Sequence, residues 1–224
     1  MLSSRKNSKV VVVGAGLAGS ECAWFLANNG IEVVLIEKKR LLLNPAQKTP
    51  LFAELVCTNS LKSREITSAH GLLKQEMKVL DSLVLAAAEH AQVPAGDALA
   101  VDREMFSTFI TKQLLQHPHI TFLDEEIDDP QILLDRFHAQ AVVIATGPLT
   151  GEKLERWMCD ELGKEDCYFY DAIAPVVDAD SLNYEKLYFK NRHEDATDTA
   201  DYLNAPLTKE EYYLFIDSLN AAEK

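Results

Sequence analysis

Three glycines at fixed spacing are the residues of this sequence best suited to bind a phosphate-bearing ligand. They form Gly14-x-Gly16-x-x-Gly19, directly after the apolar run Lys9–Val13 and before a stretch with helical spacing. In such a turn the first glycine allows a tight bend, the second lets the backbone approach a diphosphate, and the third lets helix and strand pack closely. The amino end of the helix adds N–H donors and partial positive charge. The pattern therefore predicts a dinucleotide-binding turn made of Gly14, Ala15, Gly16, Leu17, Ala18 and Gly19.

An acidic residue and a second short motif indicate which dinucleotide binds. Glu37 ends the next apolar run, residues 33–36, at the position where a carboxylate accepts hydrogen bonds from a ribose. The glycine pattern serves FAD and NAD alike, so it does not choose between them. Thr146 and Gly147 follow a third apolar run, residues 141–145, and the resulting A-T-G is similar to a segment that passes close to FAD in flavoproteins with two dinucleotide-binding domains. This similarity favours FAD.

Cys57 is the candidate nucleophile. It lies among Thr, Asn and Ser residues, with Lys62 and Arg64 nearby in the sequence, and a basic surrounding lowers the pKa of a thiol. A purely structural cysteine is the alternative that composition alone favours. The remaining cysteines, Cys22, Cys159 and Cys167, are interpreted as packing or structural residues, and neither cysteines nor histidines show metal-ligand spacing.

Charge is distributed unevenly along the 224 residues, whose formal net charge is −13. Residues 1–80 contain 11 basic and 6 acidic side chains, a balance of +5, whereas residues 81–224 contain 11 and 29, a balance of −18. A polyanion such as RNA would be repelled by the second part and is expected to dock near the first. The candidate basic patch for RNA, for which a scattered basic surface is the alternative, consists of Lys38, Lys39, Arg40, Lys48, Lys62 and Arg64.

The elements that must position these residues follow from the apolar pattern. Continuous apolar runs at 9–13, 33–36 and 141–145 predict strands buried in a parallel sheet, and 120–123 predicts a further strand. Helical spacing predicts helices at 20–29, 67–91 and 102–116, the first ending at Gly30 and the last capped by Asp102. The stretch 38–64 is expected to be irregular, and 124–129 to be a solvated acidic turn or hairpin. Beyond residue 150 we expect a helix around Trp157, a strand-like stretch at 168–177 and a helix capped by Thr208 and Glu211.

This order of elements predicts an α/β fold: a Rossmann-like FAD/NAD(P)-binding domain over residues 1–150, with a mostly parallel sheet and helices on both faces, and a partial second domain over 151–224. No apolar run is long enough to span a bilayer, and the stretch 10–13 is too short for a secretion signal. We therefore expect a cytoplasmic protein without a membrane segment.

Six segments together are similar to one family. In chain order they are G-A-G-L-A-G-S-E, F-A-E-L-V-C-T-N-S-L-K-S, G-L-L-K-Q-E-M, V-P-A-G-D-A-L-A-V-D-R-E, V-V-I-A-T-G-P-L-T and Y-F-Y-D-A-I-A-P-V-V. They resemble the folate- and FAD-dependent tRNA (uracil-5) methyltransferases (TrmFO), from about Lys9 to the chain end. The resemblance covers the N-terminal half of that family's members.

The resemblance implies a specific activity. Methylenetetrahydrofolate would donate a one-carbon unit to C5 of a uracil in the T-loop of tRNA, with FAD supplying electrons and NAD(P)H re-reducing it. Cys57 matches one of the family's two functional cysteines, and Gly14 to Gly19 with Glu37 match its FAD site. The second functional cysteine of the family lies beyond the matched segments, so the resemblance implies activity that is incomplete without a C-terminal half, which a separate partner chain could supply.

Two other interpretations remain open at this point. One is a non-catalytic relative that retains weak nucleotide binding or none, because half a flavin site lacks contacts and leaves apolar surface uncovered. The other is a flavin oxidoreductase acting on a small molecule. Bound flavin in the purified protein would count against the first, and NADPH oxidation without folate or RNA would favour the second.

Overall fold

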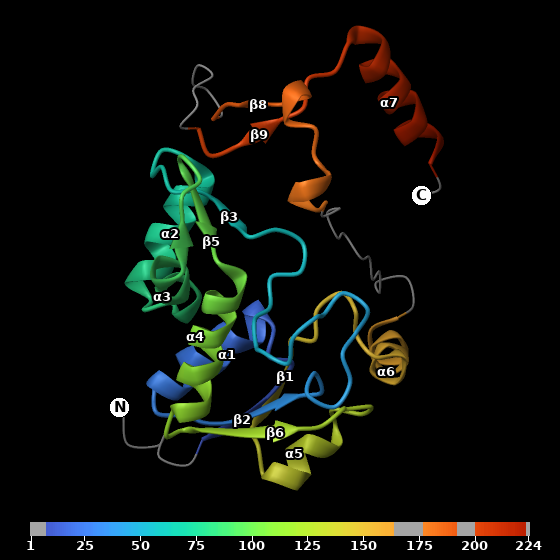
Figure 1. Cartoon of the computed structure of the whole chain (residues 1–224). Helices are drawn as coiled ribbons and strands as arrows, with labels where there is room; N and C mark the ends of the chain where they lie inside the picture. The colour runs from blue at the N-terminus through green and yellow to red at the C-terminus, as the bar shows by residue number, and fades with distance from the viewer. Residues whose placement is uncertain (1–7, 164–176, 192–199, 223–224) are drawn as a thin grey trace. The chain divides into compact units, whose positions relative to one another are not determined.

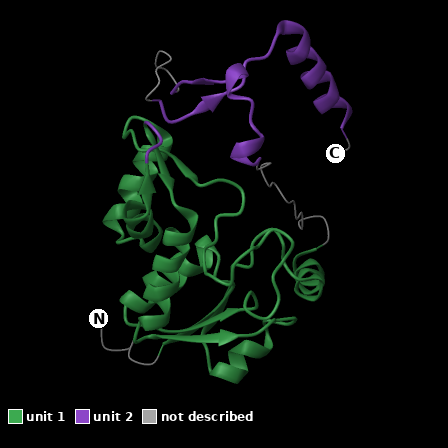
Figure 2. Ribbon diagram, viewed as in Figure 1, with its two compact units in different colours: residues 1–93, 97–174 green, residues 94–96, 175–224 purple. Residues whose placement is uncertain are grey.

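The computed structural model describes residues 8–163, 177–191 and 200–222. The chain forms two compact units, the first made of residues 1–93 and 97–174 and the second of residues 94–96 and 175–224 (Figure 2). The domain boundary expected at residue 150 stays a prediction. No helix within the described ranges is long and apolar enough to cross a membrane.

A four-stranded parallel sheet forms the centre of the first unit. Its strands are β1 (Lys9–Val13), β2 (Glu32–Glu37), β6 (Ile120–Asp124) and β7 (Ala141–Ile144), in the order β6-β2-β1-β7, and Figure 1 labels the first three. All four predicted strands are therefore confirmed, but the two outer strands, β6 and β7, contain no buried residue, so the burial expected for 141–145 is wrong. Numbered by their sequence order within this sheet, the strands run 3-2-1-4, which is the order of the Rossmann-type dinucleotide-binding half.

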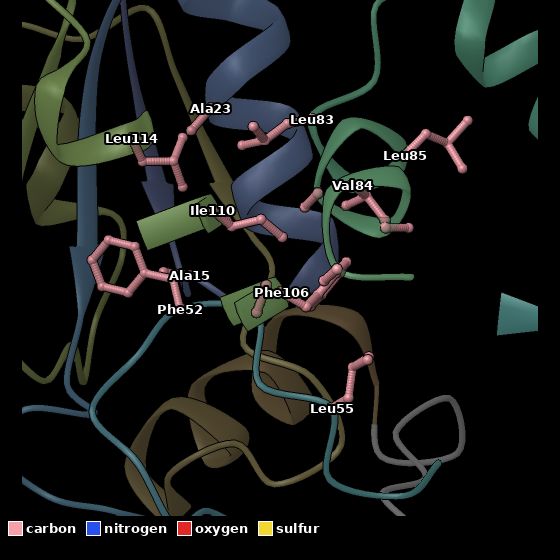
Figure 3. Close-up of a cluster of buried hydrophobic side chains, with 14 of the residues drawn as sticks. Ala15, Ala23, Phe52, Leu55, Leu83, Val84, Leu85, Phe106, Ile110 and Leu114 are labelled. Carbon is pink, nitrogen blue, oxygen red and sulfur yellow. The ribbon is translucent and has the colours of Figure 1, made fainter. Parts of the chain in front are cut away.

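Side chains of the strands alternate between two buried layers. Val12 and Leu35 pack into one layer with the helices α1 (Leu17–Asn28), α3 (Leu83–His90) and α4 (Arg103–Gln116). Figure 3 shows that layer, in which Phe106, Ile110 and Leu114 of α4 lie close to α1. Val11 and Ile36 face the opposite layer with Leu133 of α5 (Ile132–Phe137). Helices thus cover both faces of the sheet (Figure 1), as the sequence predicts.

The first helix ends where its sequence indicates. Gly30 has φ +76°, a left-handed conformation that glycine adopts without a steric penalty, and its N–H donates to the carbonyl of Ala27 at 3.0 Å. The turn brings the chain directly into β2, so that β1, α1 and β2 form one compact βαβ unit.

The single helix expected at 67–91 is wrong, because the chain forms two helices there. α2 (Ala69–Val79) ends before Asp81, which has φ +54°, and Ser82 then caps α3 by accepting a hydrogen bond from the N–H of Leu85 at 3.2 Å. Glu21 of α1 accepts a second hydrogen bond, from the N–H of Val84 at 2.8 Å. The apolar spacing continues across the break, so the sequence pattern does not reveal it. Only the Ser82 cap and the distant carboxylate of Glu21 identify residue 83 as the start of a new helix.

A small antiparallel sheet, which the sequence does not predict, lies between β2 and β6 in chain order. It consists of β3 (Ser60–Ser63), β5 (Ala98–Val101) and β4 (Gln92–Val93), in that order. The strands are short, and their apolar and polar side chains do not alternate clearly. β3 and β4 form because their backbones pair with β5, and no sequence pattern predicts them. The stretch 38–64, expected to be irregular, is irregular up to residue 59, but the expectation is wrong for residues 60–63, which form β3.

The second unit contains little buried structure. Short 3₁₀ helices at Ala179–Ser181 and Tyr184–Lys186 precede a hairpin of β8 (Tyr188–Phe189) and β9 (Leu203–Asn204), followed by α7 (Lys209–Ala221). The capping box is confirmed: Thr208 Oγ1 accepts from the N–H of Glu211 at 3.2 Å, and Glu211 Oε2 accepts from the N–H of Thr208 at 2.8 Å. Apart from Val177, the strand-like stretch expected at 168–177 lies outside the described residues, as does Cys167.

Candidate functional site

The glycine turn after β1 depends on two glycines for its shape. Gly14 has φ +101°, and a Cβ there would lie 2.4 Å from the carbonyl oxygen of Ala145. A Cβ at Gly19 would lie 1.8 Å from the carbonyl oxygen of Gly14 and 3.3 Å from Cβ of Ala145. Since these neighbours are mainly backbone, they cannot yield as a flexible side chain would. Gly14 and Gly19 therefore let β1, α1 and the end of β7 come together.

Gly16 differs from the other two because nothing lies within 4 Å of the position where its Cβ would be. It is the N-cap residue of α1, with no side-chain cap and no acidic residue in the first helical turn. The first N–H groups of a helix have no partner within the helix, and they carry partial positive charge. An exposed amino end with a bare backbone is a site where an anion such as a diphosphate can approach closely.

The carboxylate of Glu37 points at this turn from the end of the neighbouring strand. Its Oε2 accepts from the N–H of Ala15 at 2.7 Å, and its Oε1 accepts from the N–H of Lys39 at 2.9 Å. Each carboxylate oxygen has more than one lone pair, so both can still accept from hydroxyl groups. Two backbone donors thus hold Glu37 in a fixed orientation beside the glycine turn, where it can bind a ribose.

An open cleft lies at the carboxyl ends of the parallel strands, and we call it the glycine-loop cleft. Its walls come from the end of β1, the end of β2, the segment after β6, and the residues between β7 and α6 (Glu152–Leu162). Gly14, Gly16, Glu37 and Thr146 line it. In open α/β sheets this edge is where ligands bind. The structure therefore brings four of the predicted site residues to one cleft.

Thr146 and Gly147 form the turn by which the chain leaves β7. Thr146 Oγ1 lies 2.7 Å from Thr150 Oγ1, and the Thr150 hydroxyl donates to the carbonyl of Gly147 at 2.9 Å. Gly147 has φ +76° and is not among the cleft-lining residues. The predicted A-T-G motif thus contributes Thr146 to the wall and Gly147 to the turn behind it.

Cys57 lies elsewhere. It is half-buried in the irregular stretch between β2 and β3 and is not among the residues that line the glycine-loop cleft. Its role as a nucleophile stays a prediction. Cys22 packs against the core, where burial raises the pKa of its thiol, as its interpretation as a packing residue requires.

Lys39 does not belong to a surface patch, so that part of the predicted RNA-binding surface is wrong. Its side chain is 4% exposed; its Nζ lies 2.7 Å from Glu54 Oε2 and donates to the carbonyl of Leu51 at 2.7 Å. The ion pair ties the end of β2 to the irregular stretch that follows. A lysine used in this way cannot contact a phosphate from the surface.

The other candidate cations are more accessible. Lys38 pairs with Glu126 at 2.8 Å, and the Arg40 guanidinium lies over the ring of Phe122, 4.8 Å from its centroid. Lys48, Lys62 and Arg64 are exposed. A patch made of these residues stays a prediction.

The sequence did not identify the far wall of the cleft. The acidic segment 124–129, expected to be a solvated turn, contributes Glu125, Glu126 and Ile127 to the wall, and Ile127 is 6% exposed. Its carboxylates pair with cations from separate elements, namely Arg40, Arg136, Lys38 and Lys153. The strand order could have predicted this wall: β6 lies next to β2 and runs parallel to it, so the segment after β6 must reach the same edge of the sheet.

Comparisons with known proteins agree with one another. A family model described as Glucose inhibited division protein A matches residues 9–224. The methylenetetrahydrofolate–tRNA-(uracil-5-)-methyltransferase TrmFO of Lactococcus lactis subsp. cremoris (strain MG1363) is 48% identical over 220 residues, which is 98% of this chain and 47% of that protein. The TrmFO of Staphylococcus epidermidis (strain ATCC 35984) is 49% identical over 217 residues, 97% of this chain and 48% of that protein. The TrmFO of Bacillus licheniformis is 47% identical over 217 residues, which is 97% of this chain and 48% of that protein.

The chain therefore spans about half the length of the curated relatives it matches. The resemblance found from the sequence motifs is confirmed by these matches.

Proposed function

Because the chain belongs to the Glucose inhibited division protein A family, we propose that it binds FAD in the glycine-loop cleft and uses it in methylenetetrahydrofolate-dependent methylation of uracil C5 in tRNA. The observation that carries the proposal is the open backbone at Gly16 with the fixed carboxylate of Glu37 beside it. The relatives at 47–49% identity carry the name of that activity. The expected substrate is a T-loop uridine.

The residues of the cleft fit the diphosphate and ribose of FAD. A side chain at Gly16 would fill the space beside the uncapped amino end of α1, and the turn leaves that space open. Glu37 accepts hydrogen bonds from ribose hydroxyls, and its charge repels a 2′-phosphate, which disfavours NADP at this position. When bound, FAD supplies two-electron redox chemistry. The residues of this chain bind the cofactor and orient it.

Replacement of Glu37 by glutamine tests the ribose contact. The amide keeps one acceptor oxygen but turns an NH₂ group toward either the Ala15 N–H or the Lys39 N–H. We expect an FAD dissociation constant raised roughly tenfold or more and a loss of about 1–3 kcal/mol in unfolding free energy, since a donor is left unpaired. A flavin fluorescence titration measures the first. Unchanged FAD affinity would refute the assigned role of Glu37.

Cys57 is proposed as the nucleophile of the methylation. A thiolate that adds to C6 of uracil makes C5 electron-rich enough to attack the methylene carbon of the donor. Loss of the C5 proton and departure of tetrahydrofolate leave a methylene group on C5, and a hydride equivalent, which reduced FAD would supply, converts it to methyl as the thiolate is expelled from C6. Because Cys57 does not line the glycine-loop cleft, the uracil and the dinucleotide diphosphate would be bound at separate places. tRNA would dock over the exposed Lys48, Lys62 and Arg64.

One assay tests the activity and the role of Cys57. The chain is incubated with FAD, NADPH, methylenetetrahydrofolate and unmodified tRNA, with and without the unmatched half of the Lactococcus lactis relative, which we propose as a partner. We expect 5-methyluridine when that half is present, at least a hundredfold less with Cys57→Ala (about 2.7 kcal/mol at 1.36 per tenfold), and no change with Cys159→Ala. No product in either arm contradicts the proposed activity. Product formation by Cys57→Ala at the normal rate removes the nucleophile role alone.

A further inference from the structure

The residues that begin α6 form one wall of the glycine-loop cleft, yet the fold holds them weakly. Leu149, Thr150, Gly151 and Leu154 all line the cleft. Of the eleven residues of α6, all of them within the described part of the chain, Leu154 alone is buried. Segments with few buried apolar contacts open at low free energy. We call residues 149–154 the α6 turn.

One ion pair ties the α6 turn to the acidic segment after β6, and a second, between that segment and the end of β2, lies against Gly151 of the turn. Lys153 Nζ lies 2.7 Å from Asp128 Oδ2, and Lys38 Nζ lies 2.8 Å from Glu126 Oε1. The hydrogen bond that Lys153 Nζ donates to Asp128 raises the pKa of Lys153, so this lysine stays charged at neutral pH. Both pairs are partly exposed: the side chains of Lys153 and Asp128 are 71% and 47% accessible to solvent. Exposed pairs are weak and are screened by salt.

Gly151 fits against one of these pairs because it has no side chain. Its backbone, at φ −64° and ψ 143°, is one that any residue adopts. A Cβ there would lie 2.8 Å from Glu126 Oε1 and 3.0 Å from Lys38 Nζ. The glycine is thus needed for contact with the pair and not for the backbone conformation. Gly147 at φ +76° and Gly163 at φ +93° lie on either side of the segment, at positions where the chain can pivot.

We propose that the α6 turn is a lid on the glycine-loop cleft, held closed by the pair Lys153–Asp128 and by the packing of Gly151 against the pair Lys38–Glu126, and that dinucleotide enters and leaves when these contacts open. The inference rests on the proposed dinucleotide site. Weak, exposed pairs suit this role, because a lid held by a buried pair would open too rarely for ligand exchange. The opposite wall consists of the ends of β1 and β2, which belong to the sheet and stay in place when the lid opens.

Hydrogen exchange of the ligand-free protein tests the lid directly. Lys153→Gln removes one pair, whereas Arg156→Gln removes the same charge from the same helix, where Arg156 contacts only Glu152 of α6 among its ion-pair partners in the described residues. We expect the backbone amides of residues 149–154 to exchange about two- to fivefold faster in Lys153→Gln than in Arg156→Gln. Equal exchange in the two variants overturns the proposal.

Gly151→Ala provides a second test that leaves every charge in place. Its methyl group would lie 2.8 Å from Glu126 Oε1 and 3.0 Å from Lys38 Nζ, so the α6 turn can no longer pack against this pair, and the same amides are expected to exchange faster. In stopped-flow measurements with FAD, both Lys153→Gln and Gly151→Ala are expected to raise the association and dissociation rates together. Faster exchange with unchanged FAD rates contradicts a gating role. If the unaltered protein binds no FAD, the proposed function fails, while hydrogen exchange still decides whether the lid exists.

Discussion

Replacing Gly19 by alanine is expected to destabilise the first unit by at least about 3 kcal/mol, above the usual range for overpacking. The new Cβ would lie 1.8 Å from the carbonyl oxygen of Gly14, which is backbone and itself fixed by a hydrogen bond from Gly14 N–H to the carbonyl of Ile36 at 2.8 Å. Relief requires α1 to move away from β1, which opens the core layer that contains Ala23. Denaturant unfolding followed by circular dichroism measures the loss, and FAD binding should disappear with it.

Gly16→Ala is the matched variant, because it adds the same methyl group to the same turn. Nothing lies within 4 Å of the new Cβ, and φ is −71°. We expect an unfolding free energy within about 0.5 kcal/mol of the original, as for an unstrained exposed substitution. FAD affinity should fall roughly tenfold to a hundredfold, since a charge-assisted hydrogen bond to a phosphate contributes about 1.5–3 kcal/mol. Normal FAD binding by Gly16→Ala would show that the diphosphate does not approach this turn.

Lys39→Met is expected to have the second large effect, a loss of about 3–5 kcal/mol in unfolding free energy. The variant leaves the carboxylate of Glu54, 11% exposed, without the cation 2.7 Å from its Oε2. It also removes the hydrogen bond that Nζ donates to the carbonyl of Leu51. A buried carboxylate without a partner is far more unfavourable than the intact pair is favourable.

The double variant Lys39→Met with Glu54→Gln separates this explanation from a simple loss of packing. Glutamine is neutral and keeps an acceptor for the N–H of Lys48, which Glu54 Oε1 binds at 2.9 Å. We expect the double variant to recover most of the loss. Lys78→Met is the control, because its pair with Glu89 is exposed and should contribute no more than about 1 kcal/mol. Equal losses at Lys39 and Lys78 would contradict the buried-pair argument.

Local signals explain what was predictable. The two central strands, β1 and β2, contain uninterrupted apolar runs because both of their faces are buried. Gly14, Gly16 and Glu37 stand at positions fixed by their distance along the chain from β1 and β2. Neighbouring parallel strands end at one edge, so the turn and the carboxylate had to meet.

Long-range contacts explain what was missed. The break between α2 and α3 depends on the left-handed conformation of Asp81 and on Glu21, which accepts a hydrogen bond from the N–H of Val84, 63 residues away in the sequence. The apolar spacing of residues 67–91 reveals neither feature. Lys39 illustrates the same limit: beside Lys38 and Arg40 it looks like a surface cation, and only the folded stretch after β2 places Glu54 against it.

The amino-acid sequence alone determined the strand–turn–helix unit, the close packing at Gly14 and Gly19 and the place of Glu37, since residues close in sequence form these features. The tertiary structure alone decided that the acidic segment after β6 and the α6 turn complete the cleft, that Lys39 is buried, and that Cys57 lies away from the cleft-lining residues. Those outcomes depend on which segments the sheet order β6-β2-β1-β7 brings together, and pairing between distant strands leaves no local pattern from which that order can be predicted.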